Sequence, residues 1–224
     1  MLDDKYKKKD ISAIVCLLPE DQIRHMENVG RLFGAMSKKL YECGVYIEAM
    51  NEDINKEYEI AGYYHDIGKV LVPKEILSKS GKLSKKEFEI IREHPLNADK
   101  LFDYICDNKI KGIPEQYIHS ARETAAYHHE WWNGKGYPFG IAKEEIPLIA
   151  RITSICDTYD AITSNRAYRQ AYTREYACRE LEKNAGTQFE PALVRVFLEY
   201  EEEIFQLLEP NKTTAKSFNT ISIA

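Results

Sequence analysis

The segment YYHDIGK, residues 63–69, places a histidine, an aspartate and a lysine within five positions, between apolar neighbours. If the segment is helical, His65 and Lys69 lie one turn apart, and Asp66 is three residues from Lys69, so all three can serve one side of the helix. Burial of three ionisable groups is costly unless they pair or bind a metal ion. An ordinary histidine–aspartate pair at a helix end is the alternative, and the segment alone leaves both readings open.

Further histidines and a second aspartate occur where a helical fold could bring them together, and His119 is the histidine outside this pattern. Asp157 lies among apolar residues in SICDTYDAIT, where a carboxylate needs a partner and a cation is the simplest one. The set combines imidazole and carboxylate without thiolate, which suits iron, manganese or zinc and argues against a structural thiolate zinc site. The candidate ligands are His25, His65, Asp66, His94, His128, His129 and Asp157.

Two ions that share Asp66 could catalyse a phosphoryl displacement, because a carboxylate offers two oxygens. Such a pair stabilises the attacking and leaving oxygens and makes hydroxide from water near neutral pH. Lys69 would then face the developing charge or the leaving oxygen as a cation or an acid. The alternative is a coincidence of structural histidines. The adjacent pair His128 and His129 is the hardest to explain in that way.

Helices are the elements expected to position these residues, because apolar residues recur at three- and four-residue spacing and strand patterns are scarce. Ser84 and Glu87 predict a capping box, with Leu83 and Phe88 as the hydrophobic staple. The segment NGKGYPFG (133–140) predicts a loop. Helices are expected over 22–41, over about 52–68, from Ser84 to the HP at 94–95, over a following segment that buries Leu101, Phe102 and Ile105, from Pro114 to His128, over 145–162, from an N-cap at Thr173 to a C-cap at Gly186, and from Pro191 through Leu193, Phe197, Tyr200 and Ile204.

The whole chain of 224 residues is typical of one all-α domain, with 44% hydrophobic and 30% charged residues. We expect an N-terminal extension over 1–21, the main domain over 22–209 and a polar tail over 210–224. The apolar run ISAIVCLL is too short to cross a membrane, and five scattered cysteines indicate reduced thiols in a cytoplasm. A net charge of −5 argues against DNA binding but permits a small anionic ligand at bound cations.

Five motifs, in the same order along the chain, closely resemble the HD-GYP family, a branch of the HD superfamily of metal-dependent phosphohydrolases. They are HDIGK (65–69), EHP (93–95), HHEWWNGKGYP (128–138), IPLIARITSICDTYDAITSNRAYR (146–169) and NAGTQFEPALV (184–194). The resemblance covers about residues 22–205, and the long HHE…GYP block makes it specific. It implies a single HD-type helical bundle with a GYP loop. It also implies a phosphodiesterase that hydrolyses cyclic di-GMP to pGpG and/or GMP by a hydroxide formed at two or three metal ions.

The resemblance also implies roles for individual residues. Iron or manganese is expected at one position held by His25, His65, Asp66 and Asp157, and at a second held by Asp66, His94, His128 and His129. Lys69 and Asp66 are expected to be catalytic, and the substrate-binding residues are expected to be Arg166, Arg169, Asp160 and Tyr137. Asp21, four residues before His25, is a candidate ligand for a third ion, or else an acid that interacts with the helix macrodipole.

Three alternatives stay open at this point. A nucleotide or alarmone hydrolase of the wider superfamily would lack the HHE…GYP block, which this chain has. A non-catalytic module could bind a diguanylate cyclase or sensory protein through the GYP loop and an exposed Trp131–Trp132 pair. A different cyclic dinucleotide, such as cyclic GMP-AMP, could be the substrate. About twenty residues precede the motif region, so regulation is expected from elsewhere, or the chain is a fragment.

Overall fold

The computed structural model describes residues 6, 9–46, 54–107, 109–165 and 170–206. This part of the chain contains helices and loops, with no strand beyond two isolated bridges, so the predicted all-α class is confirmed. The helices are α1 (Ile11–Val15), α2 (Glu20–Glu42), α3 (Ile54–Tyr63), η3 (Ile67–Leu71), α4 (Lys74–Leu77), α5 (Lys85–Arg92), α6 (His94–Cys106), α7 (Glu115–Tyr127), η4 (Lys143–Glu145), α8 (Leu148–Thr163), α9 (Arg174–Lys183), α10 (Pro191–Glu199) and α11 (Glu201–Gln206).

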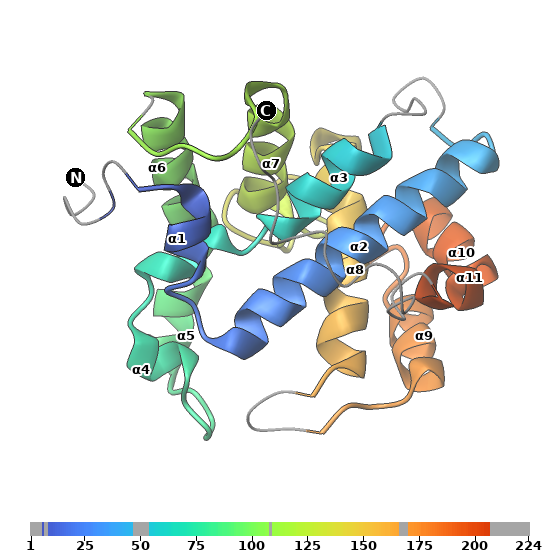
Figure 1. Cartoon of the computed structure of the whole chain (residues 1–224). Helices are drawn as coiled ribbons and strands as arrows, with labels where there is room; N and C mark the ends of the chain where they lie inside the picture. Colours follow the sequence, from blue (N-terminus) through green and yellow to red (C-terminus); the bar gives the residue numbers. More distant parts are fainter. Residues whose placement is uncertain (1–5, 7–8, 47–53, 108, 166–169, 207–224) are drawn as a thin grey trace.

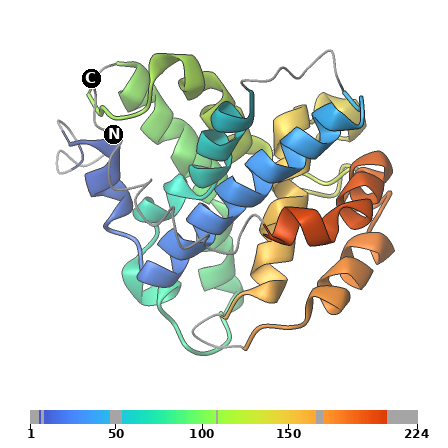
Figure 2. The same ribbon diagram turned by 45° about the vertical axis from the view of Figure 1, so that its right-hand side comes forward.

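Helix α2 is the longest helix in the described part of the chain, and it runs across the middle of the molecule in both ribbon views (Figure 1, Figure 2). Its apolar positions recur every three or four residues, and this stripe is buried, as predicted for residues 22–41. Pro19 is the N-cap, and Glu20 and Asp21 occupy the first turn, where negative charge favours the helix dipole. The helix places His25 in the interior, one turn after its start.

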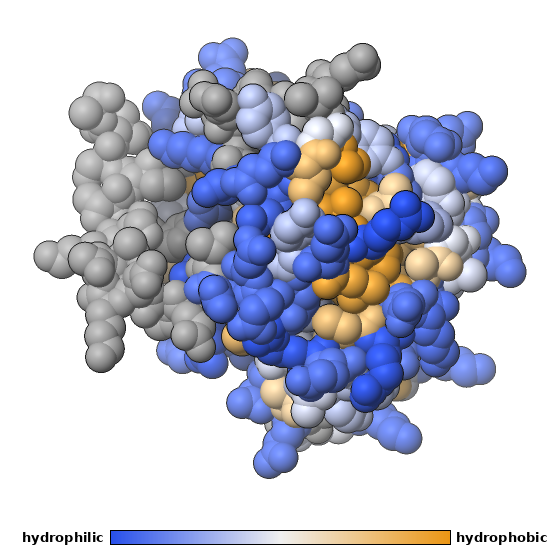
Figure 3. All heavy atoms as spheres, turned by 90° about the vertical axis from the view of Figure 1, so that its right-hand side faces the viewer, coloured by the Kyte–Doolittle hydropathy of each residue, from blue (hydrophilic) through white to orange (hydrophobic). Residues whose placement is uncertain are grey.

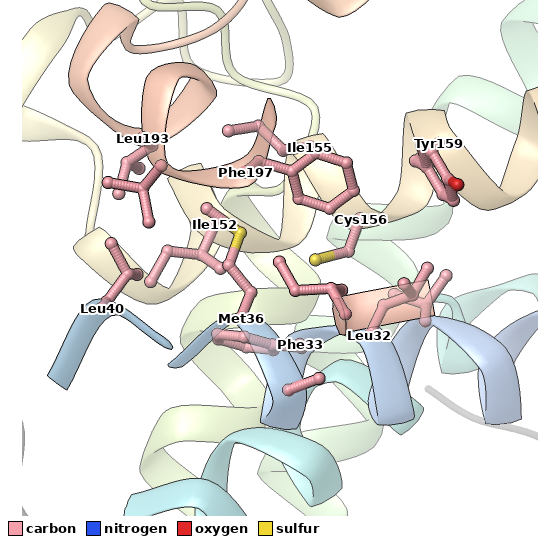
Figure 4. Close-up of a cluster of buried hydrophobic side chains, with 14 of the residues drawn as sticks. Leu32, Phe33, Met36, Leu40, Ile152, Ile155, Cys156, Tyr159, Leu193 and Phe197 are labelled. Carbon is pink, nitrogen blue, oxygen red and sulfur yellow. The ribbon is translucent and has the colours of Figure 1, made fainter. Parts of the chain in front are cut away.

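Two hydrophobic clusters surround the centre of the fold. The first joins α2 and α3 to α8, α9, α10 and α11, and the second joins α1, α6, α7 and η3. Each fully buried large side chain contributes roughly 1.5–3 kcal/mol to folding. Figure 4 shows the first cluster, and its labelled side chains are Leu32, Phe33, Met36, Leu40, Ile152, Ile155, Cys156, Tyr159, Leu193 and Phe197.

The helix predicted over 52–68 ends earlier, at Tyr63, so the reading of HDIGK as one helical turn is wrong. His65 and Asp66 lie in a turn, and Lys69 belongs to the short 3₁₀ helix η3. The tighter winding appears in the hydrogen bonds from Ile67 N to Tyr64 O (3.1 Å) and from Lys69 N to Asp66 O (2.9 Å). In this turn the two side-chain oxygens of Asp66 point toward different neighbours.

Most other predicted boundaries are confirmed, with local differences. The capping box of Ser84 and Glu87 is present, and α5 ends before His94 as expected. Leu83 and Phe88, however, stay 36% and 50% exposed, so the expected staple does not bury them. Leu101, Phe102 and Ile105 are buried, Thr173 is an N-cap, and residues 133–140 form a loop, all as predicted.

Two segments differ from the prediction toward the C-terminal end of the described chain. The last amphipathic segment is broken at Tyr200 into α10 and α11. Helix α9 ends at Lys183 with Asn184 as C-cap, and Gly186 lies in the turn that follows. Within the predicted extension 1–21, Ile11 and Ile14 of α1 belong to the second hydrophobic cluster. The predicted tail lies outside the described residues.

Hydrophilic side chains surround an apolar strip on the right-hand side of the molecule in Figure 1, where α10 and α11 lie (Figure 3). Partly buried residues of the first cluster on these helices include Leu198 and Phe205. Across the described residues, none of the helices has the length and apolar character that crossing a membrane would need.

Candidate metal centre

Seven of the predicted ligands converge in the interior from five places in the chain. They come from α2, the turn before η3, the start of α6, the end of α7 and α8. In each of two groups, the potential ligand atoms all lie within 4.8 Å of one another. The first group is His25, His65 and Asp157, and the second is Asp66, His94, His128 and His129.

Asp66 lies between the two groups and faces both. Its Oδ2 is 3.3 Å from Nε2 of His65 and 3.8 Å from Nε2 of His25. Its Oδ1 is 3.2 Å from Nε2 of His94 and 3.8 Å from Nε2 of His128. One oxygen therefore serves each group, which is the arrangement that a bridging carboxylate needs.

Hydrogen bonds at the outer ring nitrogen fix the direction of three histidines. Nδ1 of His65 lies 2.7 Å from Gly62 O, Nδ1 of His94 2.8 Å from Ile91 O, and Nδ1 of His128 3.1 Å from Thr124 O. A carbonyl only accepts, so each Nδ1 carries the proton, and Nε2 keeps its lone pair. All three lone pairs are then available to the centre, as in metal sites whose ligands are oriented by outer partners.

Two buried atoms at the centre, Nε2 of His65 and Oδ1 of Asp66, have no hydrogen-bond partner among the described residues. Such orphaned polar atoms are costly in the interior, and a cation coordinated by both groups would satisfy them. The donor set of imidazole and carboxylate suits a divalent ion. The residues therefore fit a divalent metal site.

The protonation states also suit a metal. Burial lowers the pKa of His94 to about 3 and that of His129 to about 4. Burial opposes ionisation of Asp66, but Lys69 and the nearby histidines outweigh it and hold the pKa of this carboxyl well below its usual range. At neutral pH the imidazoles of His94 and His129 are therefore neutral and the Asp66 carboxylate is charged, which is the state that coordination requires.

The family model described as HD domain matches residues 20–193, which contain all seven ligands. A solved HDGYP protein from Bdellovibrio bacteriovorus shares the fold with a TM-score of 0.58 at 14% identity, over 86% of this chain and 56% of that one. A cyclic di-GMP phosphodiesterase of Thermotoga maritima is 33% identical over 88% of this chain. This chain belongs to the HD-GYP branch of the HD domain family.

The chain spans 49% of the length of the Thermotoga relative, which is therefore about twice as long. A second relative, from Vibrio cholerae, is named a 3'3'-cGAMP-specific phosphodiesterase. It is 37% identical over 64% of this chain and 26% of its own length. The similarity thus covers 49% and 26% of the lengths of these two relatives.

Lys69 of this HD-GYP domain reaches into the centre from η3. Its Nζ lies 2.5 Å from Oδ2 of Asp66 and 3.3 Å from the side-chain oxygen of Gln22 in the first turn of α2. The ammonium is thus held beside the bridging carboxylate. Sequence analysis did not single out Gln22, although its position three residues before His25 placed it on the same helix face.

The GYP loop covers the second ligand group. The ring of Tyr137 stacks on that of His129 with centroids 4.7 Å apart, and the guanidinium of Arg92 lies 4.5 Å from the centroid of Tyr137. Burial raises the pKa of the Tyr137 hydroxyl above its usual value, so the hydroxyl remains a proton donor. Tyr137 therefore lies next to the centre, and Arg92 is a neighbouring cation that was not among the predicted site residues.

Buried Glu130 holds the GYP loop against the ligand pair. Its carboxylate accepts hydrogen bonds from Phe139 N (2.6 Å) and Gly140 N (3.0 Å). Only glycine fits at position 136, since a Cβ there would be 2.2 Å from Trp131 N. This carboxylate follows directly after the HH pair in the sequence, which was the available signal for its importance.

The turn between α9 and α10 supports the same loop from outside. Trp132 N and Asn133 N donate to Gln188 O (3.0 Å) and Thr187 O (2.9 Å). The NAGTQFEP segment and the GYP loop are therefore in direct contact. Both tryptophans of the loop are partly buried, so the expected exposed pair is not present.

Two further predicted site residues in the described part of the chain, Asp160 and Asp21, also belong to neither ligand group. Asp160 is 2% exposed and its carboxylate contacts Nδ1 of His25, while its role in substrate binding stays a prediction. Asp21 lies in the first turn of α2 and belongs to neither ligand group. Arg166 and Arg169 fall outside the described residues. His119 is exposed, in agreement with its exclusion from the set.

The metal-free HD-GYP domain is expected to become less stable as pH falls from about 6.5 toward 4. Histidines in the unfolded chain take up protons near pH 6.5, whereas His94 and His129 do so only near pH 3 and pH 4. The unfolded state then binds more protons, so each such histidine lowers the free energy of unfolding by about 1.4 kcal/mol per pH unit in this window. Urea denaturation of chelator-treated protein at a series of pH values measures the slope.

The exposed histidine supplies the control for this measurement. A His119→Gln variant should keep the wild-type slope, whereas His129→Gln should reduce it. A free energy of unfolding that does not change between pH 6.5 and pH 4 would show that the buried imidazoles are protonated as easily as in the unfolded chain.

Proposed function

We propose that this domain is a metal-dependent phosphodiesterase that hydrolyses cyclic di-GMP to pGpG and/or GMP. The observation that carries the proposal is the position of Asp66, with one oxygen toward each of two ligand groups. Two adjacent cation positions suit an in-line displacement at phosphorus. The similarity to relatives named cyclic di-GMP phosphodiesterases supports the choice of substrate.

Each residue of the centre has a role that follows from its position. Divalent ions, for which we propose iron or manganese, supply Lewis acidity and a water-derived nucleophile when bound. Asp66 keeps the two positions adjacent, and Lys69 beside it can donate a hydrogen bond or a proton to the leaving oxygen. Tyr137 covers the second group and can donate its hydroxyl to a phosphate oxygen.

We further propose that Arg166 and Arg169 hold the phosphates or bases of the substrate, because a guanidinium matches both a phosphate and the O6/N7 edge of guanine. A third ion at Asp21 remains a prediction as well. A diguanylate cyclase or a sensory protein as partner also remains a prediction. A cytoplasmic location remains one too, and the free cysteines of the chain support it.

Replacement of Lys69 by methionine is expected to lower kcat by about 100-fold, because a positioned donor at the developing charge is lost. Metal content should stay at the wild-type value, since Lys69 is no ligand. Lys69→Arg keeps the charge and serves as the matched variant. Activity near wild type in Lys69→Arg would assign an electrostatic role, and loss in both variants would assign a proton transfer. Full activity in Lys69→Met would remove Lys69 from the mechanism.

The substrate is tested by anaerobic purification, metal analysis and turnover assays with identification of products. We expect about two ions per chain and hydrolysis of cyclic di-GMP. Cyclic GMP-AMP is the second candidate, because a relative named 3'3'-cGAMP-specific phosphodiesterase is 37% identical to this chain. Parallel assays at equal concentration rank the two substrates. A metal-loaded, folded protein that hydrolyses neither would contradict the proposal and favour a binding module.

A further inference from the structure

Helix α8 holds the imidazole of His25 at both of its nitrogens. Oδ1 of Asp157 lies 2.9 Å from Nε2, on the side of the metal centre. Oδ2 of Asp160 lies 2.5 Å from Nδ1, on the opposite side of the ring. The two acids are three residues apart on one helix, so they lie on the same face and can reach the same ring.

The second oxygen of Asp160 is fixed by two further donors. Oδ1 accepts hydrogen bonds from the side chains of Asn28 on α2 and Ser164 at the end of α8, both at 2.8 Å. The Asp160 side chain is 3% exposed, so water does not compete strongly for either oxygen. The carboxylate is therefore held in one orientation, with Oδ2 directed at His25.

This contact determines which nitrogen of His25 can bind a metal. Both nitrogens of His25 face a carboxylate oxygen, which only accepts hydrogen bonds. A neutral His25 that binds a metal through Nε2, beside Asp157, therefore carries its proton on Nδ1, where Asp160 accepts it. A charged acceptor strengthens the hydrogen bond and makes the imidazole a better donor to a metal ion than a neutral acceptor does.

The other oriented histidines lack this feature. Nδ1 of His65, His94 and His128 each lies against a backbone carbonyl. His65 shares the first ligand group with His25, whereas His94 and His128 belong to the second group. The first group thus contains the carboxylate-backed imidazole, and the second contains imidazoles backed by neutral carbonyls.

We propose that Asp160 is a positioning residue that makes the His25–His65–Asp157 position the tighter of the two metal positions. The inference rests on the metal centre of the proposed function and adds an order of affinity to it. The side chains of Asn28 and Ser164 contribute indirectly, because they hold Asp160 rather than His25.

The test measures Mn²⁺ binding to chelator-treated protein by competition with a fluorescent chelator, without any turnover. Wild type should give two dissociation constants. Asp160→Ala should raise the smaller one by about 100-fold and Asp160→Asn by about 10-fold, because asparagine keeps an acceptor but loses the charge. The larger constant should change by less than about threefold in both variants. Ser164→Ala should show a smaller effect than either.

Controls separate positioning from a general loss of structure. Asp103→Asn alters an exposed carboxylate that pairs with Arg122 and should leave both constants unchanged. In a His25→Ala background, Asp160→Asn should have no further effect on binding, since its effect passes through His25. Circular dichroism of each variant confirms that the helices are intact.

Two results would overturn the inference. One is a folded Asp160→Ala variant with wild-type dissociation constants for Mn²⁺. The other is an Asp160→Asn substitution that weakens Mn²⁺ binding as much in the His25→Ala background as in the wild-type protein. The outcome is independent of the substrate. If wild type hydrolyses no cyclic dinucleotide, the proposed function fails while the Mn²⁺ measurements still decide the role of Asp160.

Discussion

Asp66→Ala is expected to lose both metal ions and to lose hydrolysis of cyclic di-GMP by more than about 1,000-fold, beyond the effect of removing a single oxyanion donor. The reason is that Asp66 contributes one oxygen to each ligand group. Its removal leaves two sets of imidazoles close together, with Asp157 as the remaining carboxylate ligand. A single substitution should therefore affect both positions, unlike loss of any one histidine.

Metal analysis after gel filtration measures the number of retained ions, and product formation measures turnover. Asp66→Asn is the matched variant, because it keeps the size of the side chain but offers one neutral oxygen. We expect it to retain at most one ion. The exposed Asp99→Ala variant controls for the loss of a surface carboxylate. Two retained ions and measurable turnover in Asp66→Ala would contradict a shared bridge.

The chemistry of the centre could be predicted because it depends on residue types that are expensive to bury. Seven histidines and aspartates require a common partner such as a cation. The helical period of α2 also indicates that His25 faces the interior. The GYP loop and the capping box at Ser84 could also be predicted, because glycine, proline and serine have strong local preferences.

Contacts between distant segments could not be predicted in the same way. Asp160 lies one turn after Asp157 on the same helix face, so its spacing was compatible with facing the substrate. Only the packing of α8 against α2 shows that Asp160 lies behind His25, which is 135 residues away in the sequence. Arg92 over Tyr137 is a second such contact, since it depends on how α5 lies against the loop.

The departure of HDIGK from a helix has a tertiary cause. The backbone at Gly68 packs directly against the first turn of α6. This tertiary contact, and not local helix propensity, sets the conformation of the segment. The sequence contained the signal in the glycine itself, because glycine is unfavourable inside helices and permits close backbone contact. The sequence does not indicate that the contact partner of Gly68 is the backbone of His94.

Gly68→Ala is therefore expected to have the second large effect on the protein. A Cβ at this position would lie 1.9 Å from the carbonyl oxygen of His94 and 2.6 Å from the backbone nitrogen of Ala98. Both are backbone atoms, so η3 and α6 must move apart. We expect a loss of roughly 3 kcal/mol in the free energy of unfolding, at the upper end for overpacking, and a fall of about 10 °C in Tm.

The substitution should also separate Asp66 from His94 within the second ligand group, because Asp66 precedes η3 and His94 begins α6. Metal retention at the second group should then fall more than the helix content measured by circular dichroism. Gly81→Ala is the control, since a Cβ at Gly81 would meet no atom within 4 Å. If Gly68→Ala matched Gly81→Ala in both Tm and metal content, the close contact of η3 with α6 would not be what holds Asp66 beside His94.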